Sequence, residues 1–204
     1  MDSSMFDFIE KVVYINLAKR TDRREHMEQM TSIFGDKVIR FEAIETKPGC
    51  IGCSKSHVAV LEMAISNNWK NVLILEDDVL WNHNEDAYDT FKSLTARPFD
   101  VILLGSTFPN YSKETFRINW TNGAFAYLVN NHYFQPLVDN FKESVALYEI
   151  QPYGWHHLDN WWNRLLTIHD CFLTAPNIIY HMDGYSDNDL KYIEWKPTDF
   201  VLTK

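Results

Sequence analysis

The sequence has no long hydrophobic run, few cysteines and a deficit of positive charge. No apolar stretch reaches the roughly 18 residues of a membrane span, and the start, "MDSSMFDFIEKVVYINL", lacks the basic and apolar regions of a signal peptide. Three cysteines, Cys50, Cys53 and Cys171, are too few for a disulfide framework. These absences predict a soluble cytoplasmic protein without a membrane span, and peripheral attachment to a membrane stays open.

The charge balance disfavours polyanionic partners. Twenty-eight acidic residues against 19 basic ones give a formal charge of −9, which argues against broad binding to nucleic acid or anionic membrane. An anionic ligand would therefore need a local metal ion, helix N-termini or clustered arginines. The 204 residues, 46% of them hydrophobic, suit one domain with a sizeable core.

Apolar segments typical of strands alternate with helical patterns. Strands are predicted at 11–17, 37–44, 71–75, 100–105 and 123–130, with one or two more in 171–181. Helices are predicted between Thr21 and Gly35, at 53–69, near 85–95, at 132–144 and at 156–169. This alternation predicts an α/β fold with helices on both faces of the sheet. Ligands bind such sheets at the carboxyl ends of the strands.

Three consecutive carboxylates follow one of these strands in "NVLILEDDVL", residues 71–80. Adjacent negative charges beside a buried strand repel one another and resist desolvation. A divalent cation such as Mg²⁺ or Mn²⁺ would offset this cost and bridge to substrate phosphates. Side chains alternate along an extended segment, so Glu76 and Asp78 are expected on one face and Asp77 on the other. A turn that begins at this point would bring Asp77 to the same site. The alternative is a solvated turn whose acids cap a helix or pair with lysines.

Three motifs resemble glycosyltransferase family 25, which includes lipopolysaccharide-type transferases, collagen galactosyltransferases and related viral enzymes. They are "VVYINLAKRTDRRE" (12–25), "GCIGCSKSHVAVLEMAISNN" (49–68) and "VLILEDDV" (72–79), in the family's order and spacing. The likeness is weaker in "NGAFAYLVN" and "APNIIYHMDGYSDND". It implies a single GT-A-type, Rossmann-like domain over 1–204 with a mixed, mainly parallel sheet. Residues 1–105 would bind the nucleotide sugar, and 106–204 would form the acceptor-binding and C-terminal part.

The resemblance places a UDP-sugar donor beside the loop after the first strand. Asn16, Arg20, Arg23 and Arg24 are the candidate contacts there, because arginine can form paired hydrogen bonds to phosphate and can stack on a base. For one or two of the arginines the alternative is pairing with nearby acids on a helix surface. Asp77 is expected to hold hydroxyls of the ribose or the sugar.

The segment "GCIGCSKSH" also allows a zinc or redox interpretation of Cys50-x-x-Cys53. A structural zinc site needs four ligands, and only His57 is near in sequence. The resemblance covers Cys53 and not Cys50, and it implies a small packing residue at Cys53. Ser56 and His57 are expected beside the donor, where His57 contacts the sugar, the phosphate or the acidic loop.

An inverting transferase needs a general base that takes the proton of the acceptor hydroxyl. "GWHHLDNWWNRL" offers Asp159 as that base, with Trp155, Trp161 and Trp162 around it as sugar-stacking surfaces. The alternative is that the tryptophans belong to the core and Asp159 lies on a helix surface.

His181 follows a late strand, and many GT-A enzymes recruit a C-terminal histidine to the metal. The resemblance thus suggests Glu76, Asp78 and His181 as the metal ligands. Asp187 fits the family's closing motif without an evident role.

The function expected from the resemblance is metal-dependent transfer of a hexose, with galactose first, from a UDP-sugar to a hydroxyl of a glycan or protein. The cofactor would be Mn²⁺ or Mg²⁺, and the anomeric carbon would be inverted. Two alternatives stay open: an inactive nucleotide-sugar-binding protein, and a metal-dependent phosphohydrolase or nucleotidyl transferase. A homo-oligomer is compatible with the sequence.

Overall fold

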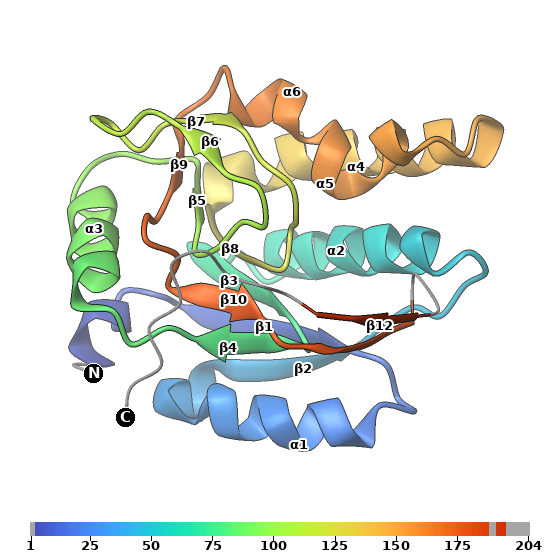
Figure 1. Cartoon of the computed structure of the whole chain (residues 1–204), viewed down its shortest axis with the longest axis horizontal. Helices are drawn as coiled ribbons and strands as arrows, with labels where there is room; N and C mark the ends of the chain where they lie inside the picture. Colours follow the sequence, from blue (N-terminus) through green and yellow to red (C-terminus); the bar gives the residue numbers. More distant parts are fainter. Residues whose placement is uncertain (1–2, 188–190, 195–204) are drawn as a thin grey trace.

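A six-stranded sheet in the order β2-β1-β3-β8-β5-β9 forms the centre of the fold (Figure 1). The structure is a computed structural model that describes residues 3–187 and 191–194. The strands are β1 (Lys11–Asn16), β2 (Val38–Glu42), β3 (Asn71–Glu76), β5 (Val101–Leu103), β8 (Ala126–Asn130) and β9 (Cys171–Leu173). Only β8 runs against its neighbours, β3 and β5, and the other neighbouring pairs are parallel. The predicted mixed, mainly parallel sheet is confirmed.

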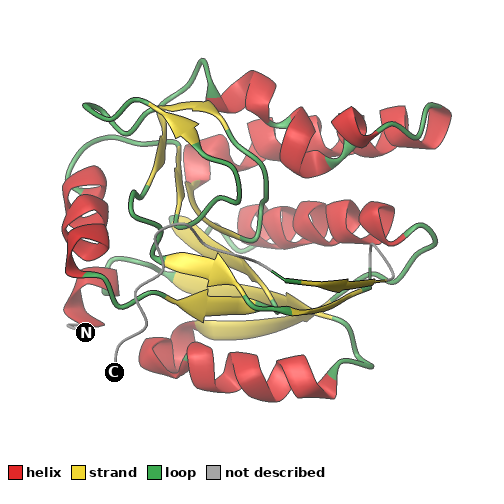
Figure 2. Cartoon of the chain, in the orientation of Figure 1, coloured by secondary structure: helices red, strands yellow, loops and turns green. Residues whose placement is uncertain are grey.

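Helices cover both faces of the sheet, as its alternating side chains require. The helices are α1 (Thr21–Met30), α2 (Gly49–Ser66), α3 (Glu85–Thr95) and α4 (Phe134–Ile150) (Figure 2). Val13 and Ile15 of β1 point into the core under α2 and α4, whereas Val12 and Tyr14 point into a second core that includes Met27 of α1. In the described ranges, no helix is both long and apolar enough to cross a membrane.

The described residues also form three short ribbons and four 3₁₀ helices. The ribbons pair β4 (Val79–Trp81) with β10 (Ile179–His181), β6 (Asn110–Tyr111) with β7 (Ile118–Trp120), and β11 (Gly184–Ser186) with β12 (Lys191–Ile193). The 3₁₀ helices are η1 (Ser3–Phe6), η2 (Ser32–Lys37), η3 (Asn131–Tyr133) and η4 (Gly154–His156). The β4–β10 ribbon places His181 directly opposite Val79, so it brings a late strand next to the acidic triplet.

The single helix predicted over 156–169 is wrong. That segment follows η4 as two short helices, α5 (Leu158–Trp161) and α6 (Asn163–Leu166). The side chain of Asn163 accepts a hydrogen bond from the backbone N–H of Thr121 and donates one to its carbonyl, both at 2.8 Å. Trp162 is fully buried against Tyr127. These tertiary contacts hold the segment in place although it does not form one continuous helix.

Candidate functional site

A cavity of about 530 Å³ opens where β1 and β3 end, at the predicted carboxyl edge of the sheet. Glu76, Asp77 and Asp78 line it from the end of β3, and His181 lines it from β10. Asp159 of α5 also lines the cavity. The fold therefore gathers the predicted metal ligands and the predicted base around one space, although His181 lies 103 residues after Asp78 in the sequence.

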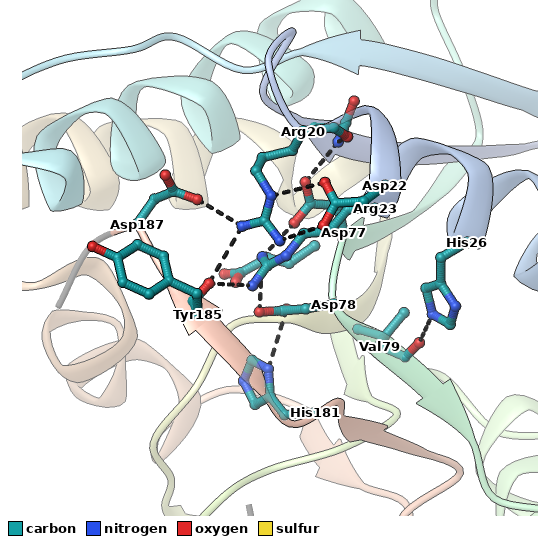
Figure 3. A network of polar contacts seen from close by, with 12 residues as sticks. Arg20, Asp22, Arg23, His26, Asp77, Asp78, Val79, His181, Tyr185 and Asp187 are labelled. Carbon is teal, nitrogen blue, oxygen red and sulfur yellow. Dashed lines mark hydrogen bonds and ion pairs between the residues drawn. The ribbon is translucent and has the colours of Figure 1, made fainter. Parts of the chain in front are cut away.

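Arg23 is the cation that pairs with Asp77 and Asp78 of the acidic triplet (Figure 3). Its Nη1 atom lies 2.7 Å from Asp77 Oδ1 and 3.0 Å from Asp78 Oδ2, and its Nη2 atom donates to the carbonyl of Tyr185 at 2.9 Å. The side chain of Arg23 is only 9% exposed. Asn16 Nδ2 donates to the other oxygen of Asp77 at 2.7 Å. Both carboxylate oxygens of Asp77, which was predicted to hold donor hydroxyls, are thus bonded to the protein.

The two aspartates have opposite pKa shifts. Burial, with the negative charge of Asp78, raises the pKa of Asp77 above its ordinary value although Arg23 acts against this. Burial also raises the pKa of Asp78, but the charge and hydrogen bond of His181, together with the charge of Arg23, outweigh this effect and lower the pKa to about 2. His181 Nδ1 lies 3.2 Å from Asp78 Oδ1. Asp78 is therefore a stable carboxylate that shares the cavity wall with an imidazole.

Glu76 faces a different set of groups. Its Oε1 atom lies 3.6 Å from His57 Nε2 and 3.9 Å from Cys53 Sγ. Glu76, His57 and Cys53 are the only three side chains of metal-binding type in the described ranges whose ligand atoms all lie within 4.8 Å of one another. Glu76 forms no such group with Asp78 and His181. The family resemblance implies a packing role for Cys53, although its i, i+4 spacing from His57 indicates a shared helix face.

The other two predicted arginines do not line the cavity, although Asp187, one partner of Arg20, does. Arg20 forms ion pairs with Asp22 and Asp187, both at 2.8 Å, and Arg24 pairs with Glu28 at 2.9 Å on the surface. Of the three predicted phosphate-binding arginines, only Arg23 lines the cavity.

Ser56 and Asn16 hold backbone in place beside the cavity. Asn16 Nδ2 donates to the carbonyl of Arg20 at 3.1 Å. Buried Ser56 donates to the carbonyl of Gly52 at 2.7 Å and accepts from the N–H of Ile44 at 2.8 Å. A Cβ on Gly52 would lie 2.1 Å from the carbonyl oxygen of Ile44, so α2 and the loop after β2 touch through backbone at this point. Ser56 tightens the same contact.

Asp159 lies in a desolvated part of the cavity. Burial raises its pKa, and the charge of Glu76 adds to the increase. The N–H of Gly123 donates to Asp159 Oδ2 at 3.3 Å. None of the three tryptophans predicted to surround Asp159 lines the cavity. Trp162 belongs to the core, and Trp155 is 74% exposed.

Several cavity residues were missed by sequence reasoning. They are Lys19, Thr46, Thr107, Asn122, Tyr148 and His157. Lys19 follows β1 and contacts Glu45 at 2.6 Å and Asp187 at 3.5 Å. The basic loop "AKR" and the turn "NG" at 122–123 were the available signals. Tyr148 and His157 give no such signal, because only the packing of α4 and α5 brings them to the cavity.

Known proteins resemble the chain in sequence and in fold. The model of glycosyltransferase family 25, described as LPS biosynthesis protein, matches residues 47–151. The crystal structure of a glycosyltransferase involved in glycosylation of the major capsid of PBCV-1 has a TM-score of 0.52 and 13% identity, over 88% of this chain and 95% of that one. A197 from STIV has a TM-score of 0.49 and 10% identity over 96% and 98%. No curated protein matches the chain significantly. At 13% identity, the first of these structural likenesses supports the fold alone.

Proposed function

The chain belongs to glycosyltransferase family 25 and is a glycosyltransferase, and from this premise we propose the reaction that it catalyses. It moves a hexose, with galactose as the first candidate, from a UDP-sugar to an acceptor hydroxyl, with inversion and with Mn²⁺ or Mg²⁺ as cofactor. The observation that carries this proposal is the cavity lined by Asp78 and His181 near the end of β3 and by Asp159 of α5.

Asp78 and His181 would hold the cation, whereas Glu76, the third ligand suggested by the sequence, faces Cys53 and His57 instead. Carboxylate oxygen and imidazole nitrogen are suitable ligands for Mn²⁺, and Asp78 Oδ1 and His181 Nδ1 lie 3.2 Å apart on the wall of the cavity. When bound, the metal neutralises negative charge on the departing diphosphate. This contribution matters in a chain whose formal charge is −9.

The chain's own residues supply position and proton transfer. Arg23 fixes the Asp77 and Asp78 carboxylates by two ion pairs, and Lys19 adds positive charge at the cavity wall. Asp159 takes the proton of the acceptor hydroxyl while the acceptor oxygen bonds to the anomeric carbon and the bond to the UDP oxygen breaks. Its raised pKa makes it a stronger base than an exposed aspartate.

The test separates donor binding from chemistry. Affinity for UDP is measured by calorimetry with and without Mn²⁺, and transfer from UDP-sugars is measured on simple glycan acceptors. Asp78→Asn should weaken metal-dependent UDP binding at least tenfold, about 1.4 kcal/mol. Asp159→Asn should keep UDP affinity and lose transfer. Asp89→Asn is the matched control, because Asp89 is exposed on α3 and does not line the cavity.

Other results would favour an alternative function or contradict a part of the proposal. Binding of a UDP-sugar without turnover on any acceptor favours a binding protein that has lost catalysis. Release of pyrophosphate from UTP and a sugar phosphate favours a nucleotidyl transferase. Unchanged UDP affinity in Asp78→Asn removes the acidic triplet from the donor site, and NMR of the product's anomeric configuration decides between inversion and retention.

A further inference from the structure

We propose that Cys53, His57 and Glu76 form a second cation site, distinct from the one proposed for the diphosphate, which takes a borderline-soft divalent ion such as Zn²⁺. The three ligand atoms are Cys53 Sγ, His57 Nε2 and Glu76 Oε1. The site does not depend on the identity of the sugar donor, since none of its geometry involves Asp78, His181 or Asp159.

Two of the three separations are close to those around a tetrahedral ion, and the third, from Cys53 Sγ to His57 Nε2, is within 4.8 Å. Zn–S bonds of about 2.3 Å and Zn–N or Zn–O bonds of about 2.0–2.1 Å place neighbouring ligand atoms roughly 3.3–3.6 Å apart. Glu76 Oε1 lies 3.6 Å from His57 Nε2 and 3.9 Å from Cys53 Sγ. An inward movement of about 0.3 Å, well within the freedom of a side chain, would bring both separations to those of a zinc centre.

The local sequence places these ligands on facing elements. Cys53 and His57 are four residues apart on α2, so they lie on one face one turn apart. Glu76 is the last residue of β3, against which α2 packs. Thiolate, imidazole and carboxylate together suit Zn²⁺, whereas Mg²⁺ prefers oxygen ligands alone.

His57 provides a second, independent observation. Its side chain is fully buried, its Nδ1 atom lies 2.9 Å from the hydroxyl of Tyr127, and its Nε2 atom has no hydrogen-bond partner within the part of the chain that the structure describes. Buried polar atoms are rarely left without a partner. A histidine whose other nitrogen is fixed by a hydrogen bond is the usual arrangement of a metal ligand. The imidazole is therefore oriented toward Cys53 and Glu76 with a nitrogen to offer.

The fourth position of the ion would face the cavity. Cys53, His57 and Glu76 all line it, and three protein ligands with one open position is the pattern of zinc sites that bind water or substrate. Cys50 lies one helical turn earlier and contacts Tyr148, outside the group of three. The Cys-x-x-Cys spacing is thus not the basis of this site.

Cobalt titration of the full chain tests the site directly. After treatment with a chelator, Co²⁺ is added and the near-ultraviolet thiolate charge-transfer band and the visible bands of tetrahedral Co²⁺ are recorded. We expect both in the wild type, with displacement by stoichiometric Zn²⁺. Cys53→Ser should abolish the charge-transfer band, and Glu76→Gln should weaken Co²⁺ binding at least tenfold. Cys50→Ser is the matched control and should retain the wild-type spectrum.

Three results would overturn the proposal: no thiolate band in the wild type, a band that persists in Cys53→Ser, or a band lost equally in Cys50→Ser. Circular dichroism establishes that each variant is folded. If Cys53→Ser does not fold, Glu76→Gln decides, because this side chain is 28% exposed at the cavity wall; unchanged Co²⁺ affinity in that variant contradicts the site. Asp78→Asn should leave the cobalt spectrum intact, so failure of the zinc site and failure of the donor site are distinguishable.

Discussion

Replacement of Arg23 by glutamine should destabilise the protein far more than replacement of the neighbouring Arg24. Arg23 is the cation shared by Asp77 and Asp78, at 2.7 and 3.0 Å, and its side chain is 9% exposed. Removing one partner of a buried ion pair leaves an uncompensated charge and costs about 3–5 kcal/mol. For a chain of this size the corresponding decrease in Tm is about 6–20 °C.

Arg24→Gln is the matched control. Arg24 and Glu28 form an i, i+4 pair whose side chains are 52% and 54% exposed, and such surface pairs contribute only about 0.3–0.5 kcal/mol. Urea unfolding of both variants at neutral pH measures the difference. Addition of Asp77→Asn to Arg23→Gln should recover part of the loss, because it removes one of the two unpaired charges.

The pH dependence provides a further check on the same reasoning. Without Arg23 the folded-state pKa values of Asp77 and Asp78 rise, so the extra cost is present when the carboxylates are ionised and shrinks as they gain protons. The difference in unfolding free energy between wild type and Arg23→Gln should therefore be smaller at pH about 4 than at neutral pH. A loss below about 1 kcal/mol, or one equal to that of Arg24→Gln, would refute the assignment of Arg23 as the stabilising cation.

Three further predictions concern pH and packing. Because the pKa of Asp78 is lowered to about 2 in the folded chain, its stabilising contribution is present above the unfolded value and is lost as pH falls from about 4 to about 2; Asp78→Asn should flatten this part of the pH–stability curve measured by urea unfolding. Burial raises the pKa of Asp159, so the folded state holds that proton more tightly and stability decreases as pH rises through this pKa; Asp159→Asn should unfold at a higher temperature than wild type at neutral pH, and an unchanged or lower Tm would contradict the buried, destabilising carboxylate. Gly52→Ala would place Cβ 2.1 Å from the carbonyl oxygen of Ile44 and should cost about 1–3 kcal/mol, whereas Gly154→Ala, with nothing within 4 Å, should unfold at the wild-type urea concentration.

The strands were predictable because a short, continuous apolar segment is typical of a strand that is buried on both faces of a sheet. "NVLIL" and "DVILLG" became β3 and β5 for that reason. The antiparallel direction of β8 was not readable, since an apolar segment looks the same in either direction. The direction of β8 is visible only in its antiparallel pairing with β3 and β5.

The acidic triplet shows where pattern reasoning fails in detail. Strict alternation assumed an extended chain through Asp78, but β3 ends at Glu76 and a bend follows. Asp77 and Asp78 therefore both reach Arg23. Their common partner lies 54 residues before Asp77, and no local pattern indicates which of three clustered arginines fills that place.

His181 was assigned by analogy and not by any local signal. Its separation from Asp78 is 103 residues, and the two meet because β10 pairs with β4. For Cys53 a local signal did exist, because its spacing to His57 is visible in the sequence. The third member of the group, Glu76, had instead been predicted to bind a metal together with Asp78.

The position of β8 between β3 and β5 limits which parts of this chain can be removed or exchanged in evolution. A break after residue 105 would leave β3 and β5 with a vacant space between them, because the strand that fills it is made later. Exposed strand edges invite pairing with other chains, so a shortened first half would tend to aggregate and would not persist as a separate folded unit. The two halves cannot be exchanged as cassettes. Sequence change is instead tolerated in the loops and short elements between the fixed strands, such as residues 106–125 and 151–170.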